Sequence, residues 1–130
     1  MSGRRPIDQA ARRREANGFG LNAEWVAAAL LRLKGYSILA RRYVVSGGEI
    51  DLIVRRGQAI AFVEVKARSR HEPAADLITA TKRRRIGRAA RVWLARNPWA
   101  VAMTLRGDAV IMARGRLPRH TPCAYRLELD

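Results

Sequence analysis

Cysteine, histidine and acidic residues are scarce in this chain of 130 residues, and each scarcity excludes a class of protein. The single cysteine, Cys123, excludes an intrachain disulfide and suits a reducing cytoplasm. One cysteine and two histidines, His71 and His120, cannot supply the usual ligands of a zinc site. The longest apolar run, Trp25 to Leu31, is far shorter than the roughly 20 residues that span a bilayer. With no secretory signal at the N-terminus, we expect a soluble cytoplasmic protein without a membrane partner.

Negative charge is also scarce, because 11 acidic residues stand against 26 lysines and arginines, a net charge of +15. Such an excess predicts a polyanionic partner, with nucleic acid ahead of an anionic membrane surface. Hydrophobic residues at 48% are enough for a globular core. We predict a basic N-terminal arm at residues 1–20, followed by one domain at 21–130. The arm is either a phosphate-binding tail or a solvated terminus.

A β-hairpin predicted at residues 49–68 is the central feature of the sequence. Two runs rich in Ile, Val and Phe flank a turn that contains glycine. With Arg56-Gly57 as the turn, Glu49 faces Glu64, and Asp51 lies diagonally across from Glu64. Alternation puts the first run's apolar residues on the face opposite these acids: Ile50, Leu52 and Val54. The second run divides into Ile60, Phe62, Glu64 and Lys66 on one face and Ala61, Val63 and Val65 on the other.

Three carboxylates beside the single ammonium of Lys66 form an unfavourable arrangement. Two carboxylates about 4 Å apart repel by roughly 4 kcal/mol at an effective dielectric near 20. A whole domain is stable by only about 5–15 kcal/mol. A shared proton or a bound divalent cation relieves such repulsion. A half-exposed Glu–Lys salt bridge is the simpler alternative, but the acids interrupt strongly apolar strands, and we favour a cation site.

Two amphipathic helices are predicted on either side of the hairpin. The first starts near Asn22 and stops at Gly35, and Glu24 belongs to its apolar stripe. That carboxylate either favours the positive helix N-terminus or is delivered to the acidic cluster. The second helix has Thr79 as its N-cap and stops at Asn97-Pro98. Its predicted apolar face consists of Ile86, Ala89, Ala90, Trp93 and Leu94.

The polar side of the second helix carries a row of arginines. Arg84, Arg88 and Arg91 follow one another at i, i+4 and i+7, and no acid lies between Lys82 and Arg106. Like charges at this spacing destabilise an isolated helix. The row therefore predicts contact with a phosphate backbone, without reading of the base sequence.

The predicted elements follow the order α-β-β-β-α-β. The remaining strands are expected at 36–45 and at about 104–113, with an edge strand around Tyr125. This order predicts an α/β fold, in which a mixed β-sheet is flanked by helices.

Asp51, followed 13 positions later by Glu64-x-Lys66, resembles the PD-(D/E)-x-K nuclease superfamily. More narrowly, a set of segments carries a second resemblance: 35–41, 48–53 and 62–68, with Glu24, Thr79, Lys82 and Arg85-Ile86. In these the chain is similar to the YraN family of bacterial proteins. Glu24 on the predicted helix, together with Asp51 and Glu64-x-Lys66, also resembles archaeal Holliday-junction resolvases. Arg106-Gly107-Asp108 departs from the pattern, since the family usually has an aromatic residue before this aspartate.

The resemblance implies a restriction-endonuclease-like core and metal-assisted hydrolysis of phosphodiester bonds. It implies that Asp51, Glu64 and the Val65 carbonyl oxygen hold Mg²⁺ or Mn²⁺, and that Lys66 orients or deprotonates water and stabilises phosphate charge. It gives Glu49 and Glu24 the role of positioning water ligands or a second ion. The implied nucleic-acid contacts are Arg68, Lys82, Arg84, Arg85, Arg88 and Arg91.

Three functions follow as hypotheses. The first is a DNA endonuclease that selects branched or single-stranded DNA. The second is a non-catalytic nucleic-acid-binding protein that keeps the nuclease fold. The third is a structural protein in which the acids form only a salt-bridge network. Because resolvases act as dimers, a homodimer is one candidate assembly.

Overall fold

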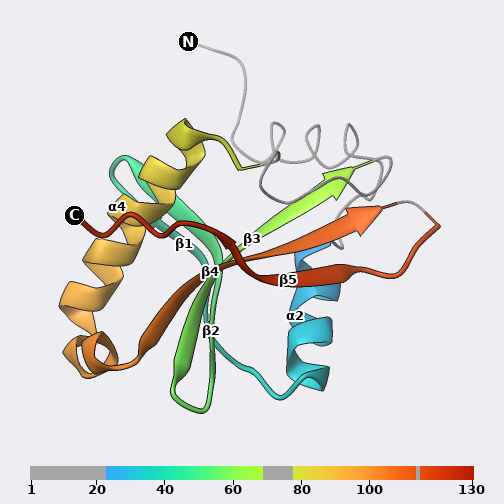
Figure 1. The fold of residues 1–130 in the computed structure, drawn as a ribbon, viewed down its shortest axis with the longest axis horizontal. Helices are drawn as coiled ribbons and strands as arrows, with labels where there is room; N and C mark the ends of the chain where they lie inside the picture. The colour runs from blue at the N-terminus through green and yellow to red at the C-terminus, as the bar shows by residue number, and fades with distance from the viewer. Residues whose placement is uncertain (1–22, 69–77, 114) are drawn as a thin grey trace, which may run out of the picture.

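The computed structural model describes residues 23–68, 78–113 and 115–130, which form one twisted sheet with a helix on each face (Figure 1). The strands lie in sequence order, and all neighbours are antiparallel except β3 and β4, which are parallel. The strands are β1 (Ser37–Val45), β2 (Gly48–Arg56), β3 (Ala59–Arg68), β4 (Thr104–Ala113) and β5 (Arg119–Tyr125). The helices are α2 (Ala23–Leu33), α4 (Ala80–Arg96) and the 3-10 helix η2 (Pro98–Ala102).

The predicted α/β class and the predicted element order are confirmed, with β5 added as the edge strand around Tyr125. Helix α4 connects the two parallel strands, as a crossover must. The predicted basic arm at 1–20 and the Asn22 cap lie outside the described residues. No helix in the described part of the chain is long and apolar enough to cross a membrane.

One boundary of each helix lies where its capping residue predicts. At the end of α2, Gly35 has a φ of +92°, and the Tyr36 N–H donates to the Leu31 carbonyl at 2.9 Å. This is a Schellman motif, which glycine accommodates because it has no Cβ. At the start of α4, Thr79 Oγ1 accepts a hydrogen bond from the Lys82 N–H at 3.1 Å.

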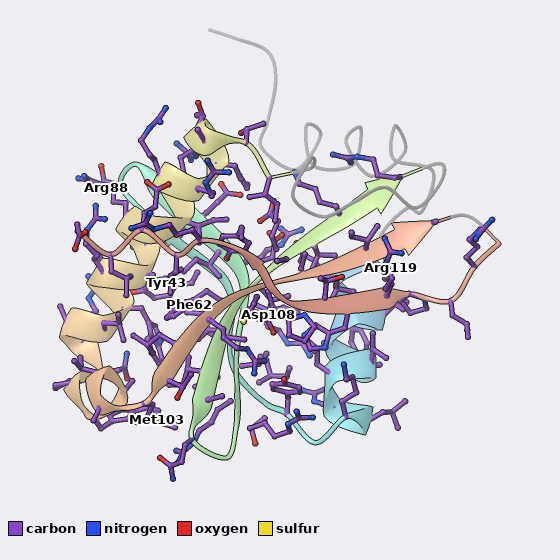
Figure 2. All side chains as sticks on the ribbon, viewed as in Figure 1. Tyr43, Phe62, Arg88, Met103, Asp108 and Arg119 are labelled. Atoms are coloured by element: carbon purple, nitrogen blue, oxygen red, sulfur yellow. The ribbon has the colours of Figure 1, made fainter. Side chains whose placement is uncertain are left out.

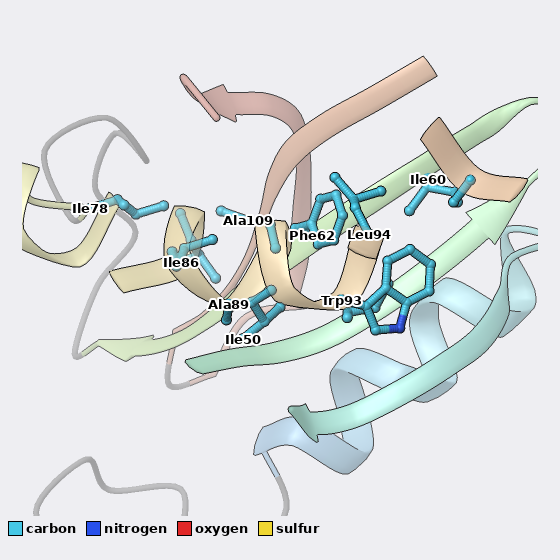
Figure 3. Close-up of a cluster of buried hydrophobic side chains, with 13 residues drawn as sticks. Ile50, Ile60, Phe62, Ile78, Ile86, Ala89, Trp93, Leu94 and Ala109 are labelled. Carbon is cyan, nitrogen blue, oxygen red and sulfur yellow. The ribbon is translucent and has the colours of Figure 1, made fainter. Parts of the chain in front are cut away.

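The core has two layers, one on each face of the sheet. Helix α4 packs against one face, where Phe62 and Trp93 meet edge to face with ring centroids 5.9 Å apart (Figure 3). The predicted apolar face of α4 is confirmed, since all five of its residues are buried. Helix α2 covers the other face with Ala27, Ala28 and Leu31. The sheet between the helices is therefore buried on both sides at its centre.

The predicted hairpin exists, but its predicted register is wrong by two residues. Gly57-Gln58 forms the turn, and Arg56 pairs with Ala59. Gly57 takes a φ of +60°, a conformation that glycine adopts readily at the first position of a two-residue turn. A shift of two preserves the side-chain faces. The predicted register puts Asp51 diagonally across from Glu64. In the structure the last β2–β3 pair is Leu52 with Val63, so the next residues along the two strands, Asp51 and Glu64, are neighbours.

One face assignment in the first run is also wrong. Leu52 and Val54 pack in the layer under α2, but Ile50 packs under α4. Regular alternation holds only within a continuous ladder, and the β2–β3 ladder ends at Leu52. The faces predicted for β3 are confirmed, with Ile60 and Phe62 toward α4.

The missing aromatic residue before Asp108 is supplied by the neighbouring strand. Tyr125 of β5 lies over Gly107, so that a Cβ on this glycine would meet the Tyr125 ring at 2.6 Å. The Tyr125 hydroxyl crosses β4 and donates to the Phe62 carbonyl oxygen of β3 at 2.6 Å. Burial, together with the nearby carboxylates, raises the pKa of Tyr125, so the hydroxyl stays protonated as a donor.

Candidate metal and nucleic-acid site

Asp51 lies at the point where β2 separates from β3. Its Oδ2 accepts a hydrogen bond from the Val65 N–H at 2.8 Å, in a place where a backbone carbonyl would otherwise pair. The carboxylate thus ends the ladder and is held by the strand that carries Glu64 and Lys66. Burial raises the pKa of the Asp51 carboxyl well above its ordinary value, and the nearby Glu64 charge raises it further.

Glu64 is the buried member of the pair, with only 2% of its surface exposed. Its Oε2 lies 3.2 Å from Lys66 Nζ and 3.4 Å from Lys82 Nζ, so one oxygen faces both lysines. Its Oε1 is buried and has no hydrogen-bond partner among the described residues. A buried carboxylate oxygen without a partner is unfavourable unless a proton or a cation meets it.

These residues fit a magnesium or manganese ion held by few protein ligands. Among the described residues, no three His, Cys, Asp or Glu side chains form a ready-made metal cluster. Two carboxylates, Asp51 and Glu64, remain beside the backbone of Val65. Mg²⁺ is commonly bound by one or two carboxylates together with waters and substrate phosphates, so a two-acid site suits it. The unpartnered Glu64 Oε1 is the atom that most clearly fits such an ion.

Glu49 and Glu24 lie at the rim of this pair. Glu49 is 39% exposed at its side chain and lies 3.8 Å from Lys82 Nζ and 3.7 Å from Arg85 Nη2. Glu24, in the first turn of α2, accepts from Arg42 Nε at 3.0 Å. Because Arg42 lies opposite Asp51 in the β1–β2 register, α2 does bring Glu24 near the acids, and the Glu24 charge contributes to the raised pKa of Asp51. The roles expected for both residues stay predictions.

Arg42 belongs to the site and was missed by the sequence analysis. The β1–β2 register pairs Arg41 with Leu52 and Tyr43 with Ile50, which puts Arg42 opposite Asp51. Its φ of +48° is unusual for a residue with a side chain. The hydrogen bond to Glu24 raises the pKa of Arg42, with smaller effects from Asp51 and Glu49. Arg41-Arg42 is one of five runs of consecutive arginines in the sequence, and nothing in its spacing indicates that Arg42 faces the acids.

The predicted nucleic-acid contacts fall into two groups. Lys82 and Arg85 turn toward the acids and act there as counter-ions. The row of Arg84, Arg88 and Arg91 runs along α4 away from them, and Figure 2 shows Arg88 at the periphery of the molecule.

Two arginines of this row also hold the fold together. Arg88 donates to the Ser46 carbonyl in the β1–β2 turn, and Arg91 donates to the Glu128 carbonyl at 3.1 Å. The C-terminal segment crosses α4 so closely that a Cβ on Gly87 would meet the Glu128 carbonyl oxygen at 2.2 Å. Arg68, at the end of β3, donates to the Ala67 carbonyl at 2.8 Å. Nucleic-acid contact by these residues stays a prediction.

A second buried charge, Asp108 on β4, was noted in the sequence only as a departure from a pattern. It is fully buried on β4, between β3 and the edge strand β5, and accepts from Arg106 at 3.1 Å and 2.8 Å. His120 Nε2 lies 2.8 Å from Asp108 Oδ2, and the Cys123 N–H donates to Oδ1 at 3.1 Å. Burial alone would raise the pKa of Asp108, but the hydrogen bonds from His120 and Arg106 outweigh it and leave the pKa below its ordinary value.

This second network extends under α2 to solvent. Arg106 also donates to the Tyr36 hydroxyl at 2.6 Å, and the hydrogen bond to Asp108 raises the pKa of Arg106. Lys34 contacts the other ring nitrogen of His120. Both carboxylate oxygens of Asp108 have hydrogen-bond partners, whereas Glu64 Oε1 has none among the described residues. We therefore interpret this network as structural. It ties β5 and the end of α2 to β4.

The raised pKa of Asp51 predicts how the stability of the metal-free protein depends on pH. The stability that this group contributes is fully present below its ordinary pKa of 3.8 and is lost as pH rises through the raised value. At neutral pH we therefore expect Asp51→Asn to be more stable than the wild type, with the difference shrinking as acid is added. Urea unfolding of both proteins in EDTA over a pH series would measure this. A difference that is constant with pH would contradict it.

Fold and site together define an α/β protein with a restriction-endonuclease-like core, in which an aspartate and a Glu-x-Lys sequence meet between two strands. The chain belongs to the family described as "Uncharacterised protein family UPF0102", whose model matches residues 23–112. The resemblance to the YraN family is thereby confirmed.

Relatives of this family match nearly the whole chain. A UPF0102 protein of Methylorubrum extorquens (strain PA1) is 58% identical over 96% of this chain and 98% of its own. One from Methylobacterium nodulans is 55% identical over 95% and 97%. One from Methylocella silvestris is 58% identical over 89% and 94%. This chain is similar to these relatives, whose descriptions name the family but no activity.

Proposed function

We propose that this protein is a divalent-metal-dependent endonuclease that hydrolyses phosphodiester bonds of DNA. The observation that carries the proposal is the buried Glu64 Oε1, which no polar group of residues 23–68, 78–113 or 115–130 meets, beside an aspartate whose pKa is raised. A lysine lies 3.2 Å from the same carboxylate. An acid pair that is unfavourable without a cation, on a protein of net charge +15, suits a reaction on a polyanion.

Each residue of the pair has a defined task in this mechanism. Asp51, Glu64 and the Val65 carbonyl oxygen would hold Mg²⁺ or Mn²⁺, which supplies Lewis acidity toward a phosphoryl oxygen. Lys66, fixed on β3 beside Glu64, would orient the attacking water, accept its proton when neutral, or stabilise charge on the phosphate. Lys82 and Arg85 face the same acids and would attract the DNA backbone toward them.

Replacing Lys66 by methionine tests whether this residue takes part in the cleavage step. We expect cleavage to slow by about 10²–10⁴-fold, the usual loss when a catalytic proton carrier or a charge-stabilising donor is removed. DNA binding should stay within a few-fold of the wild type. The assay would follow labelled branched, tailed and blunt DNAs with Mg²⁺, Mn²⁺ or EDTA.

Arg32→Met, which removes an exposed charge from α2, is the matched control and should cleave normally. Cleavage that persists in EDTA, or that Lys66→Met leaves unchanged, would refute a metal-dependent mechanism at this site.

A second candidate function, a non-catalytic nucleic-acid-binding protein, is favoured by one observation. Lys66 and Lys82 both lie within 3.4 Å of Glu64 Oε2, so the site has counter-ions of its own. This candidate predicts salt-sensitive binding without cleavage of any DNA. Binding would then be unaffected by Asp51→Asn.

A further inference from the structure

An exposed tryptophan lies directly beside the candidate site. Trp25 is 65% exposed, although large aromatic side chains normally bury most of their surface. It follows Glu24 in the first turn of α2, and Glu24 pairs at 3.0 Å with Arg42, which lies opposite Asp51 in the β1–β2 register. The indole therefore belongs to the same end of α2 as Glu24, the acid at the rim of the candidate site.

Two neighbouring arginines of β1 fix this corner of the site. The Arg41 guanidinium lies over the Trp25 ring, 5.5 Å from its centroid. The next residue, Arg42, forms the ion pair with Glu24 at 3.0 Å and lies opposite Asp51. Successive residues of α2 thus meet successive residues of the edge strand, and the ring is held under the guanidinium of Arg41.

We propose that Trp25 is a platform on which an unpaired base of the DNA substrate stacks. This inference rests on the proposed function and names its substrate class, DNA with a single-stranded segment at the cleavage site. Single-strand-binding proteins combine exposed aromatic rings with a positive groove, because every base has a π-face that can stack. A base inside a duplex is already stacked on its neighbours, so only an unpaired base can use the ring. Arg41 and Arg42 would meet the phosphates on either side of that base.

Charge favours this occupant over a second copy of the chain. Another copy would bring its own excess of positive charge against Arg41 and Arg42, whereas a DNA strand brings phosphates. The core of a protein interface is usually depleted of charged residues, whereas Arg41 lies over this ring and the adjacent residues Glu24 and Arg42 form an ion pair.

Binding measured in EDTA tests the platform without requiring cleavage. The probes are a fluorescein-labelled duplex with a single-stranded tail and the blunt duplex of the same paired sequence, followed by anisotropy. Trp25→Ala should weaken binding of the tailed DNA by about 5- to 100-fold, the usual effect of losing one base–aromatic stack. Binding of the blunt duplex should not change. Trp25→Phe should restore most of the affinity, and Trp25→Leu should not.

Two controls match the variant in exposure and chemistry. Leu33, 87% exposed on the same helix, controls for the loss of exposed apolar surface in Leu33→Ala. Trp99 is 48% exposed under the Arg55 guanidinium, at the turn end of the hairpin away from Asp51. Neither Leu33→Ala nor Trp99→Ala should discriminate between tailed and blunt DNA.

An abasic nucleotide moved along the tail locates the stacked base. At one position it should weaken wild-type binding as much as Trp25→Ala does, and combining the two changes should cost nothing more. Three results would overturn the inference: equal losses on both DNAs, wild-type affinity of Trp25→Leu for the tailed DNA, or additive losses at every position. Because binding in EDTA is independent of hydrolysis, failure of the nuclease proposal would appear separately, as absence of metal-dependent cleavage.

Discussion

Glu64→Gln is expected to abolish both metal-dependent cleavage and the thermal stabilisation that Mg²⁺ or Mn²⁺ gives to the wild type. The amide keeps the size of the side chain but removes the charge of the buried oxygen, which has no partner in the described part of the chain. A ligand that binds only the folded state at 100 times its dissociation constant stabilises that state by about 2.7 kcal/mol. This gain should vanish in the variant. Cleavage should fall by at least roughly 10³-fold, as expected when several kcal/mol of metal-ion catalysis are lost.

The measurement pairs melting curves in EDTA and in Mn²⁺ with cleavage assays on the same preparations. Glu128→Gln is the matched control, because it removes an equivalent charge that is 38% exposed and paired with Arg83. It should keep both the metal response and cleavage. If Glu64→Gln melts normally in EDTA and still responds to Mn²⁺, the ion binds elsewhere. If the wild type shows no metal response, the acids form only a salt-bridge network.

Asp108→Ala is expected to have the largest effect on stability. The substitution leaves Arg106 without its two short hydrogen bonds and removes the partner of His120 inside the sheet. Breaking a buried ion pair by removing one partner typically costs about 3–5 kcal/mol. For a domain of this size, that is a fall in melting temperature of roughly 10–20 °C. Thermal unfolding followed by circular dichroism would measure it.

The same carboxylate makes a testable contribution to acid sensitivity. Because the pKa of Asp108 is lowered in the folded protein, its contribution to stability is present above the ordinary value of 3.8 and is lost as pH falls through the lowered value. Asp51 acts in the opposite direction. Asp108→Asn should therefore remove part of the acid denaturation that the wild type shows below pH 3.8. A melting temperature of Asp108→Ala within about 2 °C of the wild type would contradict the structural role.

Much of the fold follows from patterns within single elements. Thr79 as a cap, Gly35 as a stop and the buried stripe of α4 were predictable, because capping and 3.6-residue periodicity depend on neighbours in sequence. The convergence of Glu64 and Lys66 on one face also follows from alternation along a strand. The hairpin register did not follow from the sequence, since either Arg56-Gly57 or Gly57-Gln58 could form the two-residue turn.

The sequence by itself determined the excess of positive charge, the helix ends, the buried faces of α4 and β3, and the identity of the acids that could bind a cation. Only the tertiary structure decided which groups face those acids. Arg42 reaches them through the pairing of β1 with β2. The Asp51 carboxylate accepts the Val65 N–H of β3, where a backbone carbonyl would otherwise pair. Asp108 is satisfied by residues from β4 and β5. These contacts join segments far apart in the chain, and the pairing of strands and the packing of helices are not encoded in the spacing of any one segment.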